Sequence, residues 1–185
     1  RISAHARTVL DLASRGAKTV LLAHQGRKGD ADFISLAPHA KLLEKEAAKL
    51  AKKSTTNRKG PSIRFVDDVC GEKAKAAIRA LKNGEVMLLQ NVRYLDDETK
   101  YEKNGGKSEL VSKLGPLCQL FVLDAFSCAH RRHASVVGFG RPLQMGPAAS
   151  AGSARPSVFH PIPCVAGRVM AQELEALGKF RDPPH

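Results

Sequence analysis

Three short apolar runs in this 185-residue sequence are each followed closely by histidine and arginine side chains. Arginine offers two parallel N–H donors to a phosphate or a carboxylate, and histidine donates a hydrogen bond or carries part of a positive charge. Almost no acidic residue lies among them, so the pattern predicts a binding site for an anion. The six residues are His24, Arg27, Arg93, His130, Arg131 and His133.

Other chemistries fit these residues less well. His130 and His133 are three positions apart, but the neighbouring arginines would repel a metal cation, so no metal site is predicted. No serine lies at a strand-to-helix turn, which argues against a serine nucleophile, and Asp124 is expected to cap the turn that follows it. The string Gly105–Ser108 (GGKS) is similar to the end of a phosphate-binding P-loop, but Tyr101 stands where that motif needs glycine.

The three groups need a fold that brings the ends of separate strands together. Apolar runs and helical spacing of apolar residues alternate along the chain. This alternation predicts a parallel sheet covered on both faces, an open doubly wound α/β domain with three layers, in which ligands bind beyond the carboxyl ends of the strands. The predicted strands are 19–23, 63–66, 85–90 and 120–123, and the predicted helices are 3–15, 36–53, 71–81, 108–117 and 166–178.

We expect one domain over residues 1–185, because a chain of this length with 43% hydrophobic residues buries an ordinary core. Residues 140–163 hold five of the ten prolines, which predicts an extended loop. Residues 180–185 are typical of the start of a linker. No apolar run approaches the roughly 18 residues of a membrane-spanning helix. Because the first residue is Arg1, we interpret the chain as processed, truncated or partly represented.

The four cysteines contain no C-x-x-C pair, so a zinc site is not expected. A disulfide framework is not expected in a chain with an ample core. We interpret the cysteines as small, reduced core residues, which is typical of an intracellular protein. They are Cys70, Cys118, Cys128 and Cys164.

The net charge of +12 attracts phosphates of any kind, including those of nucleic acids. Two features argue against nucleic acid. The sequence has no tryptophan and only 5% aromatic residues, so surfaces for base stacking are scarce. Much of the excess charge lies in residues 45–59, whose simpler interpretation is a solvated helix end and loop. Nucleic-acid binding by the basic surface therefore remains an alternative.

Several strings of residues, in order over nearly the whole chain, resemble the N-terminal domain of phosphoglycerate kinase, specifically of the archaeal-type branch. The strings are Arg1–Ile2, Leu21–Arg27, Phe65–Asp68, Gly84–Val86 with Leu89–Tyr94, Asp124–Arg131, and Ala166–Met170 with Glu173–Lys179.

The resemblance implies the fold of that domain with its first strand missing. It also implies phosphoryl transfer between ATP and the carboxylate of 3-phosphoglycerate, whose product is 1,3-bisphosphoglycerate. In the family, the N-terminal domain holds the acid on a basic patch, and a C-terminal domain, absent here, holds Mg-ATP. Carried over by motif, Arg1 would face the transferring phosphoryl group as a catalytic and substrate-binding residue. The residues implied to bind the phosphate end are His24, Arg27, Arg93, Arg131 and His130, with His133 as a weaker candidate.

The sequence also departs from the family. Gln90 stands where the family usually has Glu, Leu123 where it has Asn, Ser127 replaces a smaller residue, and Lys28 replaces Pro. The family's Asp and Asn that hold the glycerate precede Arg1. One hypothesis is a piece of a cytoplasmic phosphoglycerate kinase that binds 3-phosphoglycerate. The alternative is an inactive domain recruited as a structural subunit of a larger assembly, in mitochondria for example.

Overall fold

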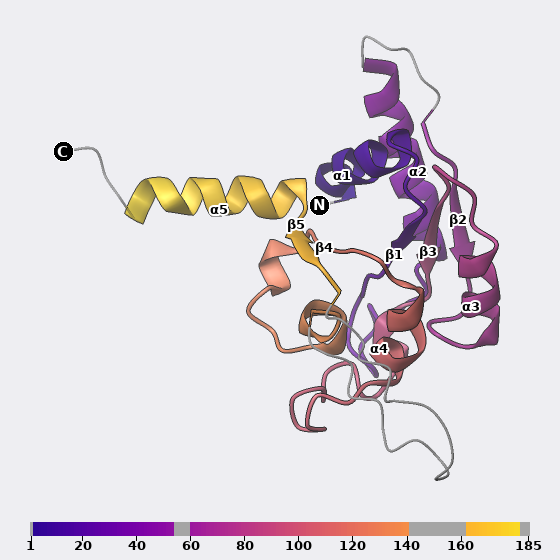
Figure 1. Ribbon diagram of the computed structural model, residues 1–185, viewed down its shortest axis with the longest axis vertical. Coiled ribbons are helices and arrows are strands. Elements are labelled where there is room, and N and C mark those ends of the chain that lie inside the picture. The colour runs from indigo at the N-terminus through magenta and orange to yellow at the C-terminus, as the bar shows by residue number, and fades with distance from the viewer. Residues whose placement is uncertain (1, 54–59, 141–161, 182–185) are drawn as a thin grey trace, which may run out of the picture.

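The computed structural model describes residues 2–53, 60–140 and 162–181 (Figure 1). Most of the predicted loop 140–163, most of the predicted linker 180–185 and Arg1 therefore lie outside the described residues. The elements in chain order are α1 (Ile2–Ser14), β1 (Thr19–Leu21), α2 (Ala37–Lys53), β2 (Ile63–Val66), α3 (Glu72–Arg79), β3 (Val86–Leu89), α4 (Glu109–Leu114), β4 (Phe121–Leu123), β5 (Cys164–Ala166) and α5 (Arg168–Arg181).

The strands are parallel and form two groups. β3 lies between β1 and β2 and pairs with both, and β4 pairs with β5. Among the described residues, the two groups share no strand pairing. The predicted parallel α/β fold is confirmed, but β5 was not predicted, because its run of only three residues, all of them exposed, is too short to identify a strand.

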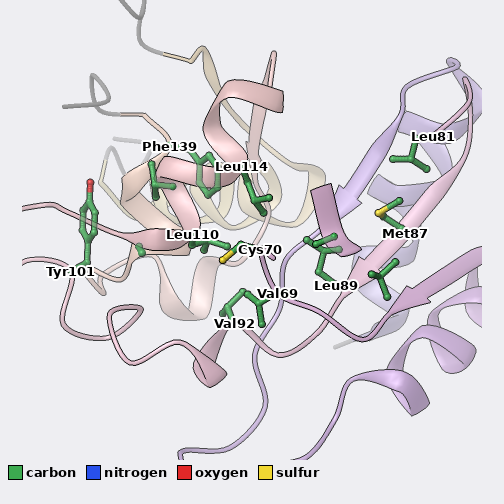
Figure 2. Packing of buried hydrophobic residues seen from close by; sticks show 14 residues of the cluster. Val69, Cys70, Leu81, Met87, Leu89, Val92, Tyr101, Leu110, Leu114 and Phe139 are labelled. Carbon is green, nitrogen blue, oxygen red and sulfur yellow. The ribbon is translucent and has the colours of Figure 1, made fainter. Parts of the chain in front are cut away.

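The middle strand β3 separates two apolar clusters, because its side chains alternate between the faces of the sheet. Val86 and Leu88 pack with residues of α1 and α2. Met87 and Leu89 pack on the other face with residues of α3 and α4 (Figure 2). All four side chains are buried. The continuous apolar run of β3 is thus the signature of a strand covered on both faces, and the predicted three layers are present.

Helix boundaries follow local chemistry. The predicted helix 108–117 is shorter, because α4 ends at Leu114 and the turn Gly115–Leu117 tightens to a 3-10 helix that contains Pro116.

Residues 105–108, the string similar to a P-loop, form a turn before α4, and no strand precedes it directly. No helix among the described residues is long and apolar enough to cross a bilayer.

The cysteines are only partly as predicted. All four are free thiols, and Cys70 and Cys128 are buried, as expected of core residues. Burial raises the pKa of Cys70 to about 11, so this thiol is protonated at neutral pH. Cys164 is exposed on β5, so its interpretation as a core residue is wrong.

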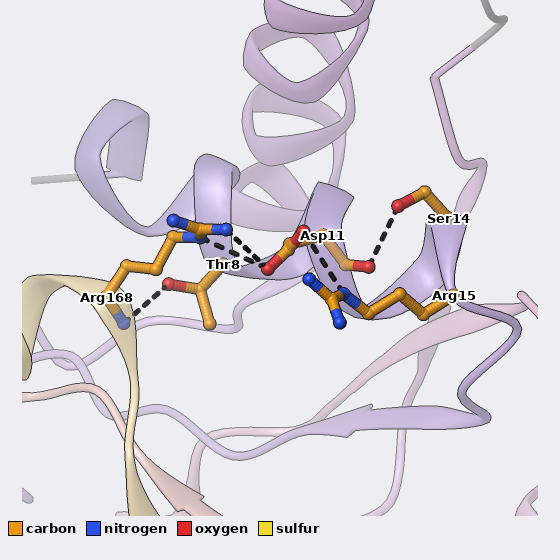
Figure 3. A network of polar contacts seen from close by, with 5 residues as sticks. All are labelled: Thr8, Asp11, Ser14, Arg15 and Arg168. Atoms are coloured by element: carbon orange, nitrogen blue, oxygen red, sulfur yellow. Dashed lines mark hydrogen bonds and ion pairs between the residues drawn. The ribbon is translucent and has the colours of Figure 1, made fainter.

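Helix α5 projects away from the sheet and is held at its first turn (Figure 1). The Arg168 guanidinium donates to Asp11 Oδ2 of α1 at 2.7 Å, and the Arg168 backbone N–H donates to Thr8 Oγ1 at 3.3 Å (Figure 3). Contacts between α1 and α5, which are distant in the sequence, therefore fix the direction in which α5 starts.

Asp124, directly after β4, completes this junction. Its Oδ1 accepts the backbone N–H of Val169 at 2.8 Å, and its Oδ2 lies 3.0 Å from Nδ1 of His5. A Cβ on Gly167 would lie 2.2 Å from Asp124 Oδ1, so a glycine is needed at that position. The sequence predicted that Asp124 caps the turn directly after it, and this was wrong, because it caps the distant helix α5 instead.

Candidate anion-binding site

The cationic residues that follow β1, β3 and β4 act on one another. The pKa of His24 is lowered to about 4, first by burial and then by the positive charges of Arg93, His133 and Arg131. Arg131 and Arg27 likewise lower the pKa of Arg93. These four residues, which follow three different strands, thus share one electric field, although 109 positions separate His24 from His133 in the sequence.

The remaining residues lie at the edge of this cationic cluster, by which we mean His24, Arg27, Arg93, His130, Arg131 and His133. His130 is exposed, and its charge lowers the pKa of His133. Arg27 is also exposed. The structure therefore brings together every predicted site residue that it describes, and Arg1 lies outside the described residues.

Two buried nitrogen atoms of the cluster have no hydrogen-bond partner among the described residues. They are Nε of Arg93 and Nδ1 of His133. Another nitrogen of Arg93, Nη1, donates to the backbone oxygen of Gly26. Buried polar atoms without a partner are costly and are normally satisfied by water or a ligand. The arrangement suits an anion that accepts several hydrogen bonds.

Asn91 is the second residue after β3, and it holds the loop that carries His24 and the turn that carries Arg93 in place. Its side chain is fully buried. Nδ2 donates to the backbone oxygens of Gln25 at 2.7 Å and Ile34 at 3.2 Å, while Oδ1 accepts the N–H of Arg93 at 3.1 Å. The loop that carries His24 and the turn that carries Arg93 are thereby joined by one amide. Asn91 was not among the residues predicted to form the site.

Gln90 ties the same loop to the end of β2. Its Oε1 accepts the N–H of Leu36 at 3.1 Å, and its Nε2 donates to Asp67 Oδ1 at 2.7 Å and to Ser35 Oγ at 3.0 Å. A glutamate at this position would have no donor to offer Asp67. The glutamine at position 90 therefore makes a hydrogen bond to Asp67 that the family's usual glutamate would not make.

Contacts at the surface also hold the loop 24–35 against residues 91–96. The rings of Phe33 and Tyr94 lie 4.7 Å apart. Lys28, another departure from the family, pairs with Asp96 at 2.9 Å, but both side chains are mostly exposed, so the pair contributes little to stability. The loop 24–35 rests along its length on residues 91–96.

A magnesium ion fits the described residues poorly. Mg²⁺ prefers oxygen ligands, commonly carboxylates. Among the described residues, no group of three or more His, Cys, Asp and Glu side chains could hold a metal ion. The cationic cluster itself offers N–H donors, which do not coordinate a cation.

The lowered pKa of His24 predicts a pH dependence of stability. Between about 6.5 and about 4, the unfolded chain protonates this residue and the folded chain does not, so stability should fall as the pH falls through that window. Because His24 is partly exposed, we expect an effect of about 1 kcal/mol. Urea unfolding at several pH values should show it, and His24→Gln should flatten the dependence. An equal slope in both proteins would contradict this assignment.

Comparison with known proteins places these features in a family context. A family model described as phosphoglycerate kinase matches residues 1–154. Phosphoglycerate kinases of Saccharolobus solfataricus and Halorubrum lacusprofundi are 38% and 40% identical over 97% and 95% of this chain. The crystal structure of the enzyme from Pyrococcus horikoshii OT3 superposes with a TM-score of 0.78 at 28% identity and covers the whole chain. The chain spans 37% of the Saccharolobus protein and 38% of the Pyrococcus chain.

Proposed function

Because the chain belongs to the phosphoglycerate kinase family, we propose that its cationic cluster binds the phosphate group of 3-phosphoglycerate. The observation that supports this most is the shared electric field of His24, Arg93, Arg131 and His133 after three separate strands. A phosphate dianion would accept a hydrogen bond from the buried Nε of Arg93 and relieve the mutual repulsion of these charges.

The proposed roles follow from the chemistry of each side chain. Arg93 and Arg131 would donate paired N–H groups to the phosphate oxygens, and Arg27 and His130 would close the outer side. His24, neutral at pH 7 because of its lowered pKa, would donate a single hydrogen bond. With the phosphate fixed, the carboxylate of the acid would be held at a defined place. Binding energy would thus act by positioning, as phosphoryl transfer requires.

The complete reaction is part of the same proposal. The chain, as one domain over residues 1–185, would hold the acid and the product 1,3-bisphosphoglycerate. Mg-ATP would be bound by residues outside this chain, and Arg1 would face the transferring group. Recruitment as a structural subunit and nucleic-acid binding are supported by no feature of the described residues.

Replacing single arginines tests the proposal. Arg27→Ala and Arg131→Ala should each weaken 3-phosphoglycerate binding about tenfold or more, because each removes charge-assisted hydrogen bonds worth about 1.5–3 kcal/mol. Titration calorimetry measures the affinity, and Arg79→Ala, an exposed arginine at the end of α3, serves as the control. Melting temperatures with 3-phosphoglycerate and with sulfate at equal ionic strength give an independent measurement. An equal shift with sulfate would contradict a specific acid site.

A further inference from the structure

One buried acid lies beside the cationic cluster, and the roles proposed above make no use of it. The side chain of Glu98 is 1% exposed. Its Oε2 accepts the backbone N–H of Ser135 at 2.9 Å, and its Oε1 accepts the Ser135 hydroxyl. Its backbone oxygen accepts the N–H of Ala134 at 3.0 Å. Glu98 thus receives three hydrogen bonds from the two residues that directly follow His133.

Glu98 also faces the charges of the site. Its Oε1 lies 4.0 Å from Nδ1 of His133, the ring nitrogen that has no partner among the described residues. Burial raises the pKa of Glu98, while the charge of Arg93 and the hydrogen bonds from Ser135 lower it. Burying a carboxylate is costly unless it is hydrogen-bonded and paired. Here the donors that stabilise it come from the segment that carries the cations.

We propose that Glu98 is a positioning residue of the anion site, which holds His133 and the preceding Arg131 against the turn that carries Arg93. This inference rests on the proposed function, because it concerns the same site. The loop of Glu98 follows Arg93 in the sequence, and the segment 130–135 returns to it after β4. Without this attachment, no buried polar contact among the described residues would join the two cationic segments.

A second contact between the two segments lies at the surface. The guanidinium of Arg132 pairs with Glu102, but both side chains are more than half exposed. Exposed ion pairs contribute little, whereas a buried and fully hydrogen-bonded carboxylate holds its partners firmly. Glu102→Gln is therefore a matched control, because it removes the same charge next to the same segment.

The direction of the change in anion affinity distinguishes a positioning role of Glu98 from a purely electrostatic effect of its negative charge. If Glu98 only opposed the positive field, Glu98→Gln would bind an anion more tightly. If Glu98 positions the segment, the same substitution weakens binding, because a neutral amide accepts hydrogen bonds with one oxygen only, whereas the carboxylate accepts both the N–H and the hydroxyl of Ser135 in charge-assisted bonds. Ser135→Ala keeps the carboxylate and removes only the hydroxyl contact, so it should weaken binding in the same direction.

The experiment is titration calorimetry with 3-phosphoglycerate, together with NMR of the His133 ring, at a temperature where each variant is folded. We expect Glu98→Gln to weaken binding about tenfold, Ser135→Ala about threefold, and Glu102→Gln less than twofold. The His133 ring signals should shift in the first two variants only. A mere loss of stability would lower the melting temperature and leave the affinity of the folded molecules unchanged.

The outcomes test the positioning role of Glu98 and the proposed function separately. Binding by the original chain with unchanged or tighter binding in Glu98→Gln would overturn the positioning role and leave the proposed function standing. If the original chain does not bind 3-phosphoglycerate, the proposed function fails, and the His133 signals then decide the positioning role alone. Should Glu98→Gln fail to fold, Ser135→Ala carries the test, and an unchanged affinity and unchanged His133 signals in that variant would overturn the inference.

Discussion

Replacing Asn91 with leucine should destabilise the fold by about 3 kcal/mol or more and abolish binding at the cationic cluster. Leucine has the same branching of heavy atoms but no polar atoms, so the backbone oxygens of Gln25 and Ile34 lose their donor and the N–H of Arg93 loses its acceptor. Each buried polar group left without a partner costs about 1–3 kcal/mol. The loop of His24 and the turn of Arg93 would then separate.

Denaturant unfolding and 3-phosphoglycerate titration together measure this effect. Asn104→Leu is the matched control, because Asn104 is exposed and none of the described side-chain hydrogen bonds involves it. That variant should unfold within about 0.5 kcal/mol of the original chain. A small effect of Asn91→Leu on both quantities would show that the loop is held by other contacts.

Replacing Gly26 with alanine should open the loop of His24 and weaken anion binding at least about tenfold. Gly26 has φ +65°, and a Cβ there would lie 2.4 Å from the backbone nitrogen of Phe33 and 2.5 Å from the backbone of Asp32. Backbone atoms cannot rotate away as a side chain would, so the loop itself must move. Its movement displaces the oxygen of Gly26 that accepts the Arg93 guanidinium.

The chain offers a control with the same backbone conformation. Gly105 has φ +63°, and a Cβ there meets nothing within 4 Å. Gly105→Ala therefore carries only the cost of the left-handed conformation, about 1–2 kcal/mol. The difference between the two variants in unfolding free energy isolates the backbone clash. Equal losses of stability, with 3-phosphoglycerate affinity unchanged in both variants, would contradict the proposed packing of the loop.

The fold was largely predictable because its strands are short apolar runs. Val86–Leu89 consists of apolar residues only, and such a run identifies a strand covered on both faces. Once the strands are known, the positions of His24, Arg93 and Arg131 shortly after them place these residues at one edge of the sheet. Local pattern and topology therefore sufficed for the cationic members of the candidate site.

The residues that support the site could not be predicted in the same way. Asn91 contacts Gln25, 66 positions earlier, and Glu98 contacts Ser135, 37 positions later. Periodicity reports which face of an element is buried, and it contains no information on which distant partner a polar side chain meets. The capping of α5 by Asp124 escaped prediction for the same reason.

Helix α5 depends for its formation on the contacts at its first turn. Short helices are marginal in water because forming the first turn is unfavourable, whereas each later residue adds a bond at little cost. Residues 171–179 are exposed, so packing stabilises them little. Thr8, Asp11 and Asp124 fix the first turn and so act as its nucleus. The helix–coil equilibrium of α5 is therefore set by α1 and β4, and its helicity reports whether that junction is formed.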